Sequence, residues 1–171
     1  MSVAGAGLVL IGPMGAGKTS IGKRVARALE LGFFDTDAAI SRAHGPIEQI
    51  FAEHGEPYFR RLERAAVTEG LATGGVVSLG GGAVMDAATR ADLGSHRVVF
   101  LAVSQRVVAG RIRGSARPLL GGGDALTRWG EIMKVRRPVY EALADVTFDT
   151  SSGPLQAIVA EIVEWARKNQ Q

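Results

Sequence analysis

Short apolar runs alternate along the chain with longer stretches in which apolar residues recur every three or four positions. The apolar runs predict five strands, at residues 8–11, 32–34, 76–79, 98–102 and 146–148. Short, continuous apolar runs are typical of strands buried at the centre of a parallel sheet. Because these runs alternate with helical patterns, we predict an α/β fold with a five-stranded parallel sheet flanked by helices.

The periodic stretches between these runs predict the helices. They lie at residues 20–31, 47–55, 59–71, 86–93, 105–113 and 126–143. A last helix is expected to begin near Pro154, with Leu155 and Ile158 on its apolar face. Residues 114–124 contain Pro118 and three consecutive glycines, which interrupt any helix, so we expect a mobile lid there.

The length and composition restrict the class of protein. A chain of 171 residues fits one domain, and 46% hydrophobic with 22% charged residues is ordinary for a soluble globular protein. No apolar run approaches the roughly 18 residues that cross a bilayer, and no signal-peptide pattern opens the chain. We therefore expect a cytoplasmic protein, with a monomer as the default. The absence of cysteine excludes disulfides, catalytic thiolates and cysteine metal sites.

The net charge is modest, at +3, and the basic residues are scattered rather than gathered in one block. Arginine supplies a large share of them, and its planar guanidinium suits phosphates and carboxylates on small ligands. A basic, ATP-sensing nucleic-acid-binding protein is the alternative that this composition leaves open. We expect neither a nucleic-acid partner nor a membrane.

A glycine-rich loop directly follows the first predicted strand. Residues 12–19 match the P-loop pattern completely: glycine, four variable residues, glycine, lysine and Ser/Thr. Backbone NH groups of such a loop, together with the following helix N-terminus, bind phosphate. Lys18 is expected to reach the β- and γ-phosphates, and the Thr19 hydroxyl to coordinate the magnesium ion that bridges them. We predict that ATP binds to Gly12, Met14, Gly15, Ala16, Gly17, Lys18, Thr19 and Ser20.

Two carboxylates follow the second predicted strand. A P-loop alone does not separate a GTPase, a motor ATPase and a small-molecule kinase, but no Asn-Lys-x-Asp guanine motif is present. Asp35 and Asp37 flank Thr36 where a doubly wound sheet opens its ligand crevice. One carboxylate can hold magnesium while the other orients or deprotonates an attacking hydroxyl. Capping of the next helix is the alternative interpretation.

These motifs, together with four others, resemble the shikimate kinase family. The others are Phe59-Arg60-Arg61 with Glu63, Gly80-Gly81-Gly82, Arg117-Pro118-Leu119-Leu120 and Arg136-Arg137-Pro138-Val139-Tyr140. Their order and spacing are specific and span nearly the whole chain. The resemblance implies a single-domain P-loop kinase fold over residues 1–171. It also implies transfer of the ATP γ-phosphoryl group to the 3-hydroxyl of shikimate, giving shikimate 3-phosphate and ADP on the way to chorismate and aromatic amino acids.

The resemblance implies a role for each matched residue. It places shikimate against Asp37, Arg60, Gly80, Gly81, Gly82 and Arg136, with a shikimate-binding region at about 35–63. The two arginines suit the shikimate carboxylate. Asp37 would be the base, or at least the orienter, of the 3-hydroxyl, and Asp35 would act on one Mg²⁺ ion, through water.

The lid and the adenine contacts also come from the resemblance. Lys18, Asp37 and Arg117 would be the catalytic residues. Arg117, in the expected lid, would close over the phosphates and stabilise the charge of the transferred group. Arg111 and Pro154 correspond to positions that hold adenine.

Some alternatives and some remaining residues carry less weight. Gluconate kinase shares the P-loop kinase architecture and a polyhydroxy acid substrate, but a different acidic motif and no such lid are expected of it. The chain could also be a regulatory pseudokinase, but the predicted catalytic residues are all intact, which argues against that function.

The histidines and tryptophans are not assigned to the site. His44, His54 and His96 lack metal-ligand spacing, and Trp129 and Trp165 are interpreted as core or helix-packing residues.

Overall fold

A single parallel sheet forms the centre of the protein in a computed structural model that describes residues 7–111 and 125–170. The sheet order is β2-β3-β1-β4-β5, and every neighbouring pair is parallel. The strands are β1 (Leu8–Ile11), β2 (Phe33–Asp35), β3 (Val76–Ser78), β4 (Arg97–Ala102) and β5 (Val146–Asp149). The predicted fold class, a five-stranded parallel sheet flanked by helices, is confirmed.

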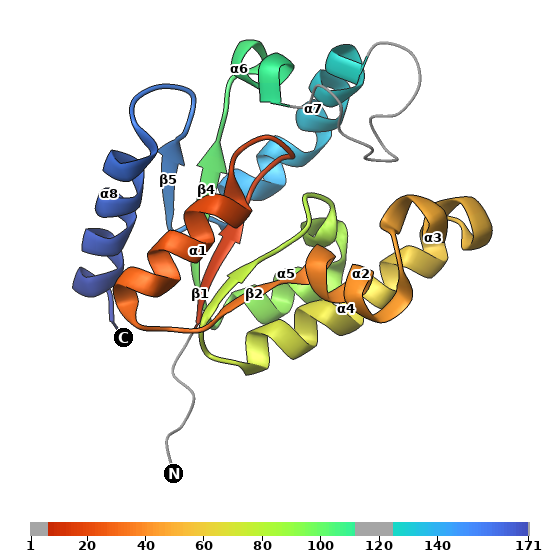
Figure 1. The fold of residues 1–171 in the computed structure, drawn as a ribbon, viewed down its shortest axis with the longest axis horizontal. Helices are drawn as coiled ribbons and strands as arrows, with labels where there is room; N and C mark the ends of the chain where they lie inside the picture. Colours follow the sequence, from red (N-terminus) through yellow and green to blue (C-terminus); the bar gives the residue numbers. More distant parts are fainter. Residues whose placement is uncertain (1–6, 112–124, 171) are drawn as a thin grey trace.

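Helices connect the strands and cover the sheet (Figure 1). They are α1 (Lys18–Leu29), α2 (Thr36–His44), α3 (Ile47–His54), α4 (Glu56–Ala72), α5 (Ala87–Leu93), α6 (Gln105–Arg111), α7 (Ala125–Leu143) and α8 (Leu155–Lys168), with a short 3₁₀ helix, η1 (Ala83–Met85). The first and last helices, α1 and α8, pack side by side. The last helix begins at Leu155, directly after Pro154, as predicted.

Several helix boundaries differ from the predicted ones by one to three residues, and the differences at α1 and at the start of α4 have local reasons. The first helix begins at Lys18 rather than residue 20, because the P-loop leads straight into its first turn. It ends at Leu29 because Glu30 adopts a left-handed backbone, with φ of 57°. Helix α4 begins at Glu56, three residues before the predicted start, and Pro57 fits its first turn because that position needs no NH donor.

Helix α2 was not predicted as an element. Its sequence is mostly polar or small, and only Thr36 and Ile40 are buried, so the apolar periodicity is weak. The helix depends instead on its N-terminal cap, where the Asp35 side chain accepts a hydrogen bond from the backbone NH of Ala38 at 3.1 Å.

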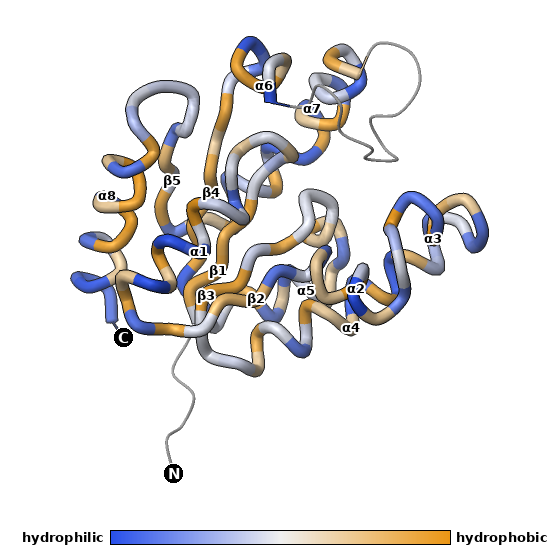
Figure 2. Tube along the Cα trace, in the orientation of Figure 1, coloured by the Kyte–Doolittle hydropathy of each residue, from blue (hydrophilic) through white to orange (hydrophobic). Residues whose placement is uncertain are grey.

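Among the described residues, the buried hydrophobic side chains form two clusters. The larger one surrounds the sheet, and its strands β1 and β3 are completely buried. A smaller cluster of Ile40, Ile50, Phe59 and Ala66 joins α2, α3 and α4, which we call the satellite helices. These helices follow the edge strand β2 and extend to one side of the sheet, away from α8 (Figure 1). Apolar and polar positions alternate along them in the hydropathy trace (Figure 2).

The sequence also led us to expect a lid and no membrane-spanning segment. The lid expected at residues 114–124 lies outside the described residues. Within the described ranges, no helix combines the length and the apolar character that a membrane crossing requires.

Candidate active site

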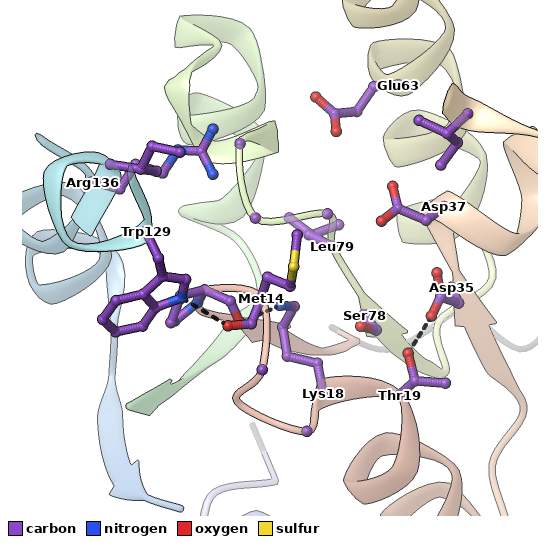
Figure 3. A pocket seen from close by; sticks show the side chains of 18 of the residues that line it. Met14, Lys18, Thr19, Asp35, Asp37, Glu63, Ser78, Leu79, Trp129 and Arg136 are labelled. Carbon is purple, nitrogen blue, oxygen red and sulfur yellow. Dashed lines mark hydrogen bonds between the residues drawn. The ribbon is translucent and has the colours of Figure 1, made fainter. Parts of the chain in front are cut away.

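A cavity of about 400 Å³ lies where the P-loop, the satellite helices and α7 meet (Figure 3). It is lined by most of the predicted phosphate- and shikimate-binding residues. Asp35, Asp37 and Glu63 approach from one side in Figure 3, and Trp129 and Arg136 from the other. A volume of this size is typical of small-ligand sites. The topology therefore gathers residues from most of the chain around one space.

The P-loop curls before α1 because two of its glycines adopt a left-handed backbone. Gly15 and Gly17 have φ of 89° and 88°, which few other residues adopt. The Lys18 ammonium folds back over the loop and donates hydrogen bonds to the carbonyl oxygens of Gly12 at 2.7 Å and Pro13 at 3.0 Å. The amine thus lies at the mouth of the loop. Met14, Gly15, Gly17, Thr19 and Ser20 also line the cavity, whereas Gly12 and Ala16 are buried behind it.

Asp35 has two functions in this structure. One carboxylate oxygen caps α2, as described above, and the other accepts a hydrogen bond from the Thr19 hydroxyl at 2.6 Å. The helix cap is therefore present, and the second bond places Asp35 beside the hydroxyl that is predicted to coordinate magnesium, whereas the magnesium role of Asp35 itself stays a prediction. Hydroxyl and carboxylate oxygens suit magnesium.

The oxygens of Thr19 and Asp35 would supply only part of a magnesium coordination shell. Within residues 7–111 and 125–170, no three His, Cys, Asp or Glu side chains converge as a metal site. A magnesium ion here would take its other ligands from phosphate and water, which is how magnesium is usually bound with nucleotides.

Two carboxylates and two guanidiniums converge on the glycine turn after β3. A methyl group added to Gly80 would lie 2.8 Å from an oxygen of Asp37 and 2.9 Å from one of Glu63. A methyl group on Gly82 would lie 2.6 Å from a nitrogen of Arg60 and 2.9 Å from one of Arg136. Only glycine leaves room for these groups. The turn is thus surrounded by acidic groups at one end and basic groups at the other.

The turn is also fixed by its neighbours. The Gly80 NH donates to the hydroxyl of Thr36, which is completely buried, at 3.0 Å. The Gly81 carbonyl accepts a hydrogen bond from the Tyr140 hydroxyl at 2.6 Å. Burial raises the pKa of Tyr140 to about 12, although the nearby Arg136 opposes the shift. Tyr140 is therefore neutral at physiological pH and remains a hydrogen-bond donor.

Glu63 is a buried partner of Arg60 that the sequence reasoning did not assign to the site. Its side chain is 5% exposed and accepts from Arg60 at 2.7 Å, while the more exposed Glu56 accepts from the same guanidinium at 3.1 Å. Burial raises the pKa of Glu63, against the opposing effect of Arg60. The spacing of Glu56, Arg60 and Glu63 places them on one helical face. This spacing could have predicted from the sequence that both glutamates pair with Arg60.

Trp129 was expected to be a packing residue, and it is buried, but it also lines the cavity. Its indole nitrogen donates to the carbonyl oxygen of Met14, in the P-loop, at 2.9 Å (Figure 3). No local pattern predicts this contact, because the two residues are 115 positions apart.

Of the two predicted adenine contacts, the structure places Arg111 against the P-loop but does not bring Pro154 to the cavity. Arg111, at the end of α6, donates to the Gly15 carbonyl at 2.8 Å and to the Thr150 carbonyl at 2.8 Å. It lines the cavity. Pro154 is exposed at the start of α8 and does not line the cavity. Arg117 lies outside the described residues.

Sequence comparisons support the family resemblance. The family model described as "Shikimate kinase" matches residues 14–167. A shikimate kinase of Rhodococcus erythropolis is 46% identical over 160 residues, which are 91% of this chain and 94% of that protein. A shikimate kinase of Thermobifida fusca is 47% identical over 146 residues, covering 84% of each chain.

Solved structures agree with the sequence comparisons. Shikimate kinase from Acinetobacter baumannii, in complex with shikimate, superposes with a TM-score of 0.91 at 32% identity, covering 97% of this chain and 95% of that one. A gluconokinase from Sinorhizobium meliloti has a TM-score of 0.62 at 22% identity, covering 96% and 93%, and so shares the fold alone. The predicted family and activity class are confirmed: the chain belongs to the shikimate kinase family of ATP-dependent kinases.

Proposed function

We propose that the protein transfers the γ-phosphoryl group of ATP to the 3-hydroxyl of shikimate at the cavity described above. The observation that carries this proposal is the convergence of Arg60, Arg136, Asp37 and Glu63 on the glycine turn, in the same cavity as the P-loop. A planar carboxylate with neighbouring hydroxyls matches two guanidiniums beside acidic groups. The complex of the Acinetobacter baumannii relative with shikimate supports the same ligand.

On the donor side, the P-loop backbone would hold the ATP phosphates. The Lys18 ammonium, already at the mouth of the loop, would move onto the β- and γ-phosphates and neutralise charge as the phosphoryl group leaves. Thr19 and, through water, Asp35 would hold one magnesium ion. When bound, that ion offsets the negative charge of the phosphates.

On the acceptor side, Arg60 and Arg136 would bind the shikimate carboxylate. Asp37, beside Gly80, would accept a hydrogen bond from the 3-hydroxyl, orient its oxygen for attack and take its proton as the bond to phosphorus forms. Glu63 would hold Arg60 in place. Gly80, Gly81 and Gly82 would let the ring approach the turn closely.

The remaining assignments concern the lid, the adenine contacts and the protein as a whole. Arg117 would close over the phosphates, and Arg111 and Pro154 would contact adenine. Because Arg111 already bonds to the P-loop and to Thr150, it would have to release one of these partners or stack on the base in place. We also propose one kinase domain, acting as a cytoplasmic monomer. Size-exclusion chromatography with light scattering tests the monomer.

A substrate panel tests the reaction. The purified protein would be assayed for ADP release with ATP and magnesium against shikimate, quinate, gluconate and nucleoside monophosphates. We expect rapid turnover with shikimate, and phosphorus NMR of the product should place the phosphate on the 3-oxygen. Turnover with gluconate and none with shikimate would overturn the proposal.

A further inference from the structure

Helix α7 touches both halves of the cavity through one stripe of side chains. Trp129, Met133, Arg136 and Tyr140 are separated by four, three and four positions, which places them on one helical face. Trp129 bonds to the P-loop and Tyr140 to the glycine turn, and Arg136 lies between them along the helix. One rigid element therefore spans the distance from the phosphate-binding loop to the acceptor turn.

The hydrogen bond from Trp129 to Met14 is suited to holding the P-loop in one position. Trp129 is 5% exposed, so its indole ring has little freedom. Its NH donates to the backbone carbonyl of Met14 at 2.9 Å, with good geometry for a hydrogen bond. Met14 directly precedes Gly15, whose left-handed backbone turns the loop. A bond to this carbonyl restrains the peptide plane at which the loop begins to turn around the phosphates.

We infer that Trp129 is a positioning residue for the phosphate donor: its indole NH holds the Met14 carbonyl and thereby sets the P-loop relative to α7. Trp129 does not itself touch the reacting atoms. Without the NH, the Met14 carbonyl loses this partly buried donor and its peptide gains freedom to rotate. The loop then presents its NH groups to ATP less accurately, and small misplacements at a reacting centre lower the rate.

The inference rests on the proposed function, because it is measured through ATP and shikimate kinetics. Trp129→Phe keeps one aromatic ring at this buried site and removes the donor together with the second ring of the indole. We expect kcat/KM for ATP to fall about tenfold, from the loss of one partly buried hydrogen bond. The KM for shikimate should stay within about twofold, because the groups around the glycine turn are unchanged.

Trp165→Phe is the matched control. Trp165 lies on α8, packs against the sheet core and does not line the cavity. We expect its kinetic constants to equal those of the wild type. Wild-type constants in Trp129→Phe, or equal losses for both substrates that track a lower Tm, would overturn the inference. Inactivity of the wild type with shikimate would instead overturn the proposed function.

A second measurement leaves Trp129 intact. In Trp165→Phe, Trp129 is the only tryptophan, so the fluorescence of the protein reports its surroundings. Binding of MgADP should change the emission, because the loop bonded to the indole orders around the phosphates. Shikimate alone should change it less. An emission spectrum that MgADP leaves unchanged at saturation would overturn the inference.

Discussion

The donor side and the acceptor side of the cavity are built in different ways. The proposed donor side is formed mainly by one continuous segment, residues 12–20, which would act through its backbone and through Lys18. The acceptor side takes side chains from separate segments, represented by Asp37, Arg60 and Arg136, and places them around a glycine turn. A donor site made of backbone depends on local conformation, whereas the acceptor site depends on tertiary packing. Changes on the two sides should therefore affect different kinetic constants.

The largest expected effect is on the donor side. Lys18→Met should lower kcat by about 10²- to 10³-fold, because it removes a positive charge that stabilises the transferring phosphoryl group. The KM for shikimate should change little, which coupled ADP-release assays at saturating ATP would measure. The control is Lys23→Met, which removes an exposed lysine from the same helix. A Lys18→Met enzyme that keeps more than about a tenth of the wild-type kcat would contradict the division between the two sides.

Next in size is the loss of an acceptor-side guanidinium. Arg136→Ala should raise the KM for shikimate about 10- to 100-fold, because a charge-assisted hydrogen bond to the carboxylate disappears. The KM for ATP should remain near that of the wild type. Arg137→Ala is the control, since Arg137 is half exposed and pairs with Glu141 on the surface. An equal rise in the KM values for both substrates would break the comparison.

A smaller effect is expected when the glycine turn is filled. In Gly82→Ala the added methyl group would lie within 3 Å of both guanidiniums and push them aside. We expect the KM for shikimate to rise about tenfold, with kcat less affected. Gly32→Ala, where the new methyl group meets nothing within 4 Å, serves as the control. Unchanged shikimate binding in Gly82→Ala would show that the turn has more room than this structure gives it.

The smallest effect concerns pH and the buried carboxylate of the acceptor side. Burial raises the pKa of Glu63, so at pH values just above the ordinary glutamate pKa its carboxylate is protonated more often in the folded protein than in the unfolded chain. Between the ordinary pKa and the raised pKa, the contribution of Glu63 to the free energy of unfolding falls as pH rises. Above the raised pKa that contribution is constant. The Tm of the wild type relative to Glu63→Gln should therefore decrease as pH rises from about 4.5, the ordinary value.

The matched control for this measurement is Glu56→Gln, which removes the more exposed carboxylate from the same guanidinium. Thermal unfolding of all three proteins would be followed across pH. The difference in Tm between the wild type and Glu63→Gln could stay constant with pH, or Glu56→Gln could show the same dependence on pH. Either result would show that burial of Glu63 does not cause the pH dependence of stability.

The same contrast explains what the sequence could predict. The P-loop, the strand β1 and the start of α8 depend on local patterns, and all three were predicted. Helix α2 was missed because its stability comes from a cap and from packing in the smaller core rather than from its own apolar periodicity.

On the acceptor side, the motifs named the residues but not their partners. Glu63 was part of a recognised segment, yet its burial against Arg60 is a tertiary property. The bond from Trp129 to Met14 joins positions 115 residues apart, which no local pattern encodes. Family resemblance supplied roles for matched positions, but it could not supply a contact made by a residue outside the motifs.

The hydrogen bond from Gly80 to Thr36 has a consequence for the evolution of the chain. These residues follow β2 and β3, which are neighbours in the sheet, and the satellite helices are inserted between them. The bond joins the start and the end of this insertion through the completely buried hydroxyl of Thr36. Since lengthening a closed loop costs little free energy, the surface connection at residues 45–46 can gain or lose residues while Asp37 and the glycine turn keep their positions.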